Sequence, residues 1–166
     1  MVTMTDGLKS IKERLGEAVC GEFEFRGEET LILQKASLPQ SLAVLKEEFG
    51  FDCLVDLCGV DMGVEESPRF YVVYHLRNME TKAQLRIKVG LEEGESIPSA
   101  CSVWSGANWM EREAYDMFGI EFEGHPDLTR LYLPDEFPGY PLRKDYPTEG
   151  YDLEGASYGS GDGTDR

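Results

Sequence analysis

The side chains best suited to acid–base chemistry gather in the last third of the sequence. Glu111, Glu113, Asp116 and His125 all carry groups that can transfer a proton. They come without a nucleophile–base–orienter spacing or a glycine-rich phosphate loop, and on a helix Glu111 would point away from Asp116. We therefore expect no catalytic residue on this chain. A purified chain with activity of its own would support the competing hypothesis of an acid–base enzyme.

The sulfur ligands give a metal site little support. Cys20, Cys53, Cys58 and Cys101 contain no Cys-x-x-Cys pair. Cys53 and Cys58 fall in a predicted strand, and positions five apart on a strand point to opposite faces. His125 stands alone and is expected to brace a turn rather than to bind metal. The sequence therefore predicts neither a metal nor another cofactor on this chain.

A helix is predicted over residues 107–118, ending at Gly119, and its two faces differ. The face suited to packing on a sheet comprises Ala107, Met110, Ala114, Met117 and Phe118. The other face comprises Trp109, Arg112, Glu113 and Asp116. Because these four are spaced i, i+3, i+4 and i+7, we expect one exposed stripe that contains an Arg112–Asp116 ion pair.

Two interpretations of this stripe stay open. In the first, it is an ordinary solvated face, and its ion pair contributes only about 0.3–0.5 kcal/mol. In the second, it contacts another protein, since tryptophan and arginine are the residues most enriched in interface anchors. The residue types favour the second interpretation.

Residues 121–148 follow the helix and hold five of the eight prolines. Proline fixes φ and removes a backbone donor, so we expect an extended strap that docks on a partner. The alternative is a loop that merely covers an edge of the sheet. The candidate partner-binding residues of the strap are His125, Arg130, Tyr140, Arg143, Lys144, Asp145 and Tyr146. The acidic, glycine-rich tail at 149–166 is expected to be disordered unless bound.

The elements that position these residues lie in a predicted α+β domain at 1–120. Helices are expected at 6–18 and 37–50, the second opened by a capping box from Ser37 to Gln40. Strands are expected at 22–25, 30–35, 51–60, 69–77 and 83–90. This order indicates a single mixed, largely antiparallel sheet of four or five strands with helices packed on one face.

Alternation along the last two predicted strands separates a buried from an outer face. The buried face comprises Phe70, Val72, Tyr74, Leu76, Leu85, Ile87 and Val89. The outer face comprises Tyr71, Val73, His75, Arg77, Gln84, Arg86 and Lys88. This basic outer face is either solvated or a docking face for an acidic partner, and the charge pattern alone does not decide between them.

Composition excludes several classes of function. The 166 residues, 41% of them apolar, suffice for one domain with its own core. A net charge of −16 repels nucleic-acid phosphates and anionic lipids. There is no apolar run of the ~20 residues that span a bilayer, and the N-terminus lacks a signal-peptide pattern, so we expect the protein to stay where it is made.

The region from 111 to 147 resembles the 30 kDa subunit, designated C, of NADH:quinone oxidoreductase (respiratory complex I). The residues that carry the resemblance are Glu111-Arg112-Glu113 running into Asp116 and Phe118-Gly119, then 124–130 (GHPDLTR), 133–135 (LPD) and 139–147 (GYPLRKDYP). Thr129 departs from the pattern, because a basic residue is common there in the family. The preceding α/β portion is compatible in length with the family but does not identify it.

The resemblance implies a non-catalytic, peripheral scaffold subunit of the hydrophilic arm of a proton-translocating enzyme. It implies contacts with the large quinone-site subunit and the ferredoxin-like iron–sulfur subunit. FMN, iron–sulfur clusters and quinone would be held by other subunits, and the chain would lie on the cytoplasmic side of the bacterial inner membrane. It would meet no nucleic acid, and it would touch the membrane only through the complex.

Related assemblies leave alternatives. Membrane-bound hydrogenases and F420H2 dehydrogenases use similar subunits, so the resemblance does not fix the electron donor or the type of quinone. A free-standing protein-binding module is the other alternative.

Overall fold

The computed structural model describes residues 4–150. Its elements are α1 (Met4–Leu15), β1 (Val19–Phe25), β2 (Glu28–Leu33), α2 (Leu38–Glu47), β3 (Cys53–Asp61), β4 (Phe70–Arg77), β5 (Gln84–Leu91), β6 (Ser96–Pro98), α3 (Ala107–Phe118) and β7 (Glu121–Glu123). Within the described range, no helix is long and apolar enough to cross a bilayer. The predicted acidic tail lies outside the described residues from position 151 onward.

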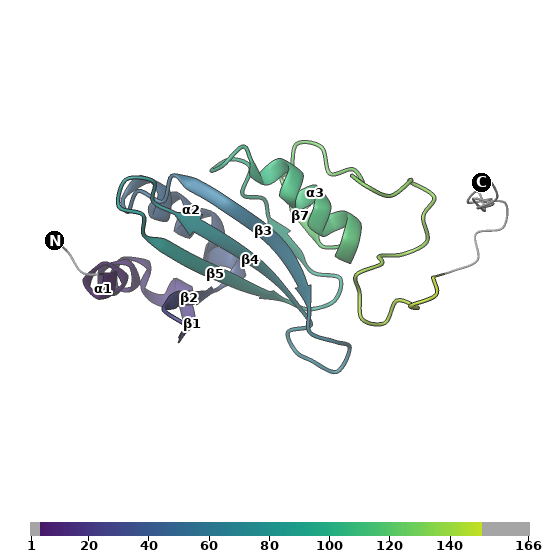
Figure 1. The fold of residues 1–166 in the computed structure, drawn as a ribbon, viewed down its shortest axis with the longest axis horizontal. Helices are drawn as coiled ribbons and strands as arrows, with labels where there is room; N and C mark the ends of the chain where they lie inside the picture. The colour runs from purple at the N-terminus through teal and green to yellow at the C-terminus, as the bar shows by residue number, and fades with distance from the viewer. Residues whose placement is uncertain (1–3, 151–166) are drawn as a thin grey trace, which may run out of the picture.

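Five strands form one mixed sheet in the order β1-β2-β5-β4-β3 (Figure 1). Neighbouring strands are antiparallel except β2 and β5, which run parallel. The β1–β2 hairpin turns at Arg26 and Gly27, whose φ angles of 54° and 81° are left-handed, as a tight two-residue hairpin turn requires. The predicted α+β class and its mixed, largely antiparallel sheet are therefore confirmed.

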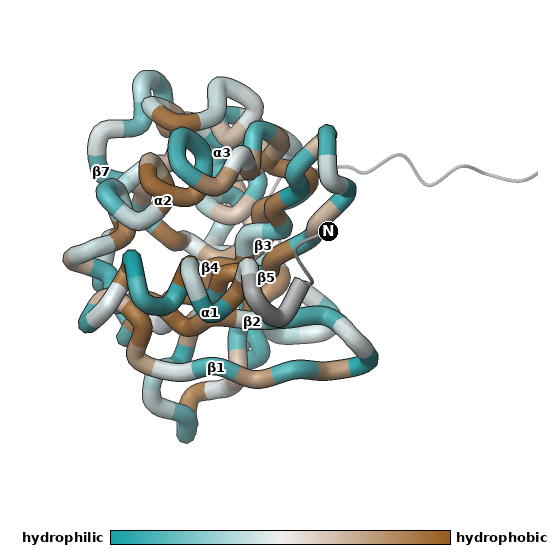
Figure 2. The backbone as a smooth tube through the Cα atoms, turned by 90° about the vertical axis from the view of Figure 1, so that its left-hand side faces the viewer, coloured by the Kyte–Doolittle hydropathy of each residue, from teal (hydrophilic) through white to brown (hydrophobic). Residues whose placement is uncertain are grey.

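The helices cover one face of this sheet. α2 packs on one side of the strands (Figures 1 and 2), and its Leu38, Leu42 and Leu45 are buried in the core. All the residues of β4 and β5 that alternation assigns to the buried face belong to the same core cluster. The core therefore lies between the helices and this face, and the outer face of the sheet carries no helix in the described part of the chain.

A β-bulge in β3 overturns the expected orientation of two cysteines. The register shifts at Val55, so that Cys53 pairs with Arg77 and Cys58 pairs with Val73. Directly paired residues point to the same side of a sheet, and both partners belong to the outer face. Cys53 and Cys58 therefore share a face. The prediction of opposite faces is wrong because simple alternation does not count the extra residue.

The predicted capping box at the start of α2 is also wrong. A 3-10 turn at Lys35–Ser37 precedes the helix, and Ser37 is already in a helical conformation, with φ −96° and ψ −1°. An N-cap serine needs an extended backbone before its hydroxyl can bond to the next turn. Ser37 makes no such bond, and its carbonyl instead accepts a hydrogen bond from Ser41 Oγ at 2.8 Å.

Helix α3 covers the predicted residues and ends at Gly119, whose φ of 74° is left-handed. The helix packs closely on β3, because a Cβ added at Gly59 would stand 2.7 Å from the Phe118 ring. α3 also connects β6 to β7, which pair as a small parallel sheet. Residues 121–123 are thus a strand, whereas the sequence assigned them to an irregular strap. Three residues are too few for alternation to reveal a strand.

Candidate partner-binding site on helix α3 and the C-terminal strap

Asp116 on α3 is fully buried and does not pair with Arg112, so the predicted exposed ion pair is wrong. Its Oδ1 accepts a hydrogen bond from Arg130 Nη1 at 3.1 Å. Its Oδ2 accepts the backbone N–H groups of residues 131, 132 and 133 at 3.0, 2.7 and 3.0 Å. Burial by itself raises the pKa of this carboxyl, but these bonds and the Arg130 charge outweigh it and hold the pKa below its usual value.

Arg112 binds the same segment of the strap from its other side. Its Nε donates to the Thr129 carbonyl and its Nη2 to the Arg130 carbonyl, both at 3.0 Å. Its guanidinium also lies 5.0 Å from the centre of the Trp109 ring. Arg112 and Asp116 therefore bind the strap to α3 instead of each other, and we call this set of contacts the Asp116 lock.

A second set of contacts fixes the end of the strap to the sheet. Arg69, only 4% exposed, donates to Asp61 at 3.2 Å, to Glu93 at 2.6 Å and to Asp145 at 2.6 Å. Asp61 also accepts the backbone N–H of Lys144 at 2.8 Å. The hydrogen bond to Asp61 raises the pKa of Arg69, so the guanidinium stays charged. We call this set the Arg69 lock.

Three further predicted strap residues, Tyr140, Arg143 and Tyr146, pack beside the two locks. The rings of Tyr140 and Tyr115 meet edge-on, with their centres 6.3 Å apart. The Arg143 guanidinium lies 4.7 Å from the centre of the Tyr140 ring. Arg143 Nε also donates to the Phe118 carbonyl at 2.6 Å. Tyr146 stacks on Phe137 at 6.2 Å. The strap is therefore held along its length by its own domain.

The locks leave a few large apolar groups on the surface of α3 and the strap. Trp109 is 60% exposed, Tyr132 is 66% exposed and Leu142 is 54% exposed. Glu113, predicted in the same stripe as Trp109, is also exposed. Trp109 and Glu113 thus keep the predicted surface position. Tyr132 and Leu142 lie within the predicted strap but are not among the candidate partner-binding residues named from the sequence. Their apolar side chains in a proline-rich segment are the signal that could have found them.

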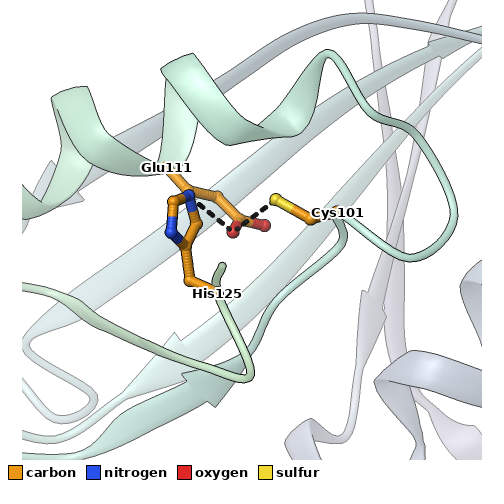
Figure 3. A group of neighbouring side chains, drawn as sticks. All are labelled: Cys101, Glu111 and His125. Carbon is orange, nitrogen blue, oxygen red and sulfur yellow. Dashed lines mark hydrogen bonds and ion pairs between the residues drawn. The ribbon is translucent and has the colours of Figure 1, made fainter. Parts of the chain in front are cut away.

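Glu111 is buried and forms a separate cluster with the partly buried His125 and Cys101 (Figure 3). Glu111 accepts hydrogen bonds from the Ala100 N–H and from Ser99 Oγ, both at 2.6 Å. Burial raises the pKa of this carboxyl, and the two bonds only partly offset the effect. Glu111 therefore ties α3 to the loop that follows β6.

The hydrogen bonds of His125 define its role. Its Nε2 lies 3.1 Å from the Asn108 carbonyl, which can only accept, so Nε2 carries the hydrogen. Its Nδ1 accepts the Asp127 N–H at 3.0 Å. This is the predicted bracing of a turn. The ring is satisfied in its neutral form, although Nε2 lies 4.0 Å from Glu111 Oε2.

This cluster is the one group of candidate metal ligands found in the described residues, with ligand atoms within 4.8 Å of one another. A metal there would have to replace the hydrogen on His125 Nε2 and the donors to Glu111. Burial also raises the pKa of the Cys101 thiol, which opposes the thiolate that a metal needs. The hydrogen bonds within the protein therefore explain this cluster better than a bound ion would. Asp116 and Glu113 lie outside the cluster, so the four residues considered for acid–base chemistry do not form one site.

Comparison with known proteins gives the family. The model for the respiratory-chain NADH dehydrogenase 30 Kd subunit matches residues 31–152. The NADH-quinone oxidoreductase subunit designated C in Citrifermentans bemidjiense is 43% identical, covering 87% of this chain and 89% of the relative. Its counterpart in Geotalea uraniireducens is 44% identical, covering 87% and 88%.

A solved structure shares the fold. A chain of the membrane-bound sulfane sulfur reductase, an archaeal respiratory membrane complex, matches with a TM-score of 0.73 at 24% identity, covering 87% of this chain and 86% of that chain. The similarity extends over nearly the whole chain. The chain belongs to the 30 kDa subunit family of the respiratory-chain NADH dehydrogenase, complex I.

Proposed function

We propose that this chain is a non-catalytic scaffold subunit in the hydrophilic arm of a proton-translocating NADH:quinone oxidoreductase. It braces the large quinone-site subunit and the ferredoxin-like iron–sulfur subunit, on the cytoplasmic side of the bacterial inner membrane. FMN, iron–sulfur clusters and quinone are held by those and other subunits. Family membership supports the kind of complex, and the site supports a role in docking.

The observation that carries the proposal is the exposure of Trp109 beside a strap that is already held in place. A 60% exposed tryptophan is rare on a solvated helix, and Arg112 stacks on its ring while hydrogen-bonding the strap. The strap needs no partner to order it, so little conformational entropy is lost on docking. A rigid surface with exposed apolar anchors suits a subunit that fixes the geometry of its neighbours.

The other predicted partner-binding residues stand as proposed contacts within this surface. Glu113, Arg130, Tyr140, Arg143, Lys144, Asp145 and Tyr146 shape or border it, and several of them act by holding the strap. His125 contributes through the turn after β7. We expect Trp109, Tyr132 and Leu142 to supply most of the apolar contact area.

The test is assembly in native membranes. Trp109→Ala is expected to leave the isolated chain folded, because the side chain is exposed, but to reduce its incorporation into the high-mass complex on a native gel. Met79→Ala is the matched control, since Met79 is 47% exposed in the turn between β4 and β5. Unchanged assembly of the Trp109 variant contradicts the proposal.

A related host assembly is the second candidate, because the matching solved chain comes from a sulfane sulfur reductase complex. The chain would then brace an assembly with another electron donor. Mass spectrometry of the co-purifying chains separates the two. A nucleotide-binding flavoprotein favours NADH as donor, whereas nickel in the preparation favours a hydrogenase. A chain that runs as a stable monomer in native extract would instead be a free-standing binding module.

A further inference from the structure

The outer face of the five-stranded sheet, opposite α1, α2 and α3, plays no part in the proposed docking through α3. Strand pairing places Ile32, Lys88, Val73 and Cys58 in one row across it. Val73 is only 5% exposed, yet it stands outside the main core cluster. The outer face therefore has a small apolar cluster of its own, which a purely solvated face does not need.

That cluster surrounds a hollow of about 170 Å³. Its walls include Phe23, Ile32, Val60, Tyr71 and Val73, with one cation, Lys88. Lys88 Nζ lies 5.0 Å from the centre of the Phe23 ring and 6.0 Å from that of Tyr71. Phe23 is 40% exposed. The hollow thus offers apolar contacts and a positive charge at the same place.

A second hollow of about 280 Å³ lies on the same face and has a mixed lining. Val55, His75, Arg77 and Arg86 line it together with the carboxylates of Glu28, Glu29 and Asp56. Arg86 is already neutralised by an ion pair with Glu28. Arg77 differs, because its Nε is buried and has no hydrogen-bond acceptor among residues 4–150. A buried N–H without an acceptor is uncommon in folded proteins, so Arg77 is a cation whose hydrogen-bonding capacity the described domain leaves unused.

Charge decides which molecule fits. Neither Lys88 nor Arg77 forms an ion pair with a carboxylate in the described part of the chain, although the protein carries a net charge of −16. Carboxylates match these two cations, whereas the overall charge repels nucleic acid and anionic lipid. A second copy is disfavoured, because it would bring the same two unpaired cations to the interface, whereas a segment rich in carboxylates supplies their counter-charges.

We propose that the outer face is a second docking surface, which binds a segment of another subunit with apolar side chains interspersed with carboxylates. The apolar side chains enter the hollow beside Phe23 and Tyr71, and the carboxylates meet Lys88 and Arg77. The inference extends the proposed function, because the partner belongs to the same assembly. It does not require docking through α3.

The test is photocrosslinking of the full chain in native membranes. A benzophenone amino acid replaces Phe23 in one variant and Trp109 in another, so that the two surfaces report separately. The Phe23 probe is expected to give an adduct with another polypeptide, whose crosslinked peptide contains apolar and acidic residues. Adding Lys88→Glu should lower the yield of this adduct about tenfold or more, since like charges then face each other. Lys88→Arg keeps the charge and should keep the adduct.

Each other outcome overturns the inference. An adduct with a second copy of the chain, or with lipid, identifies a different occupant. A Phe23 adduct whose yield is unchanged by Lys88→Glu contradicts the charge argument, provided that circular dichroism shows the probe variant folded with and without Lys88→Glu. No Phe23 adduct together with a Trp109 adduct removes this inference and leaves the proposed function standing. If neither the Phe23 probe nor the Trp109 probe gives an adduct in an intact assembly, both this inference and the proposed function are contradicted.

Discussion

The Asp116 lock can be broken with one substitution. Asp116→Ala removes a buried carboxylate that holds Arg130 and three consecutive backbone N–H groups of the strap. All four donors then lose their acceptor, and Arg130 loses its ion pair. We expect the strap between residues 129 and 133 to open from α3 far more often, while the sheet and its core stay folded.

The magnitude follows from the burial. Removing one partner of a buried charge pair typically costs about 3–5 kcal/mol. Each 1.4 kcal/mol is a factor of about ten in an equilibrium constant. If the loss falls on local opening, amide exchange at residues 131–133 should accelerate about 10²- to 10⁴-fold. Asp116→Asn retains one oxygen acceptor and should give a smaller acceleration.

Hydrogen exchange read by mass spectrometry on the purified chain measures this directly. Glu113→Ala is the matched control, because Glu113 lies on the same helix but is exposed, and it should change stability by less than about 0.5 kcal/mol. Unchanged exchange at residues 131–133 in folded Asp116→Ala would refute the assignment of this carboxylate as the anchor of the strap.

Three further predictions concern stability. The folded protein holds the pKa of Asp116 below its usual value, so the stability that this carboxylate adds is present above the ordinary aspartate pKa of about 4 and is lost as the pH falls through the folded value. Urea midpoints of wild type and Asp116→Asn should therefore differ by a constant amount from pH 5 to 8 and converge below about pH 4. Urea denaturation should show a loss of about 3–5 kcal/mol for Arg69→Ala, which strands a buried carboxylate, but only about 0–1 kcal/mol for Asp145→Ala, whose side chain is 47% exposed; equal losses would contradict the Arg69 lock. Thermal melts should show that Gly119→Ala destabilises the protein by more than about 1 kcal/mol, because φ is 74° there and the new Cβ would stand 2.5 Å from the Tyr140 ring. Gly106→Ala should not destabilise it, because φ is −64° and the space around the new Cβ is open; similar melting temperatures would count against the packing of the strap on α3.

Local patterns could predict the elements that carry the site. The apolar spacing of residues 107–118 and the glycine at 119 define α3 because both act within one or two helical turns. The alternation along β4 and β5 identifies their buried faces, because one face of each strand meets the helices. The bulge at Val55 escaped prediction because an inserted residue leaves the composition of a strand unchanged.

The contacts within the site could not be predicted in the same way. Spacing pairs Arg112 with Asp116 because a helix brings i and i+4 together. Tertiary structure overrides this pairing, because the strap returns to α3 and supplies Asp116 with four donors that no local rule can identify. The Arg69 lock likewise joins β3, the residue before β4, the loop after β5 and the strap. Its members have no spacing that links them.

The central claim is that another polypeptide of the complex covers Trp109 and the strap surface beside it. Hydroxyl-radical footprinting measures this directly, as the oxidation rate of Trp109 in the free chain and in the intact complex. We predict rapid oxidation in the free chain, where the side chain is 60% exposed, and strong protection in the complex, while Met79 keeps its rate in both. Equal oxidation of Trp109 in the two states would contradict the account.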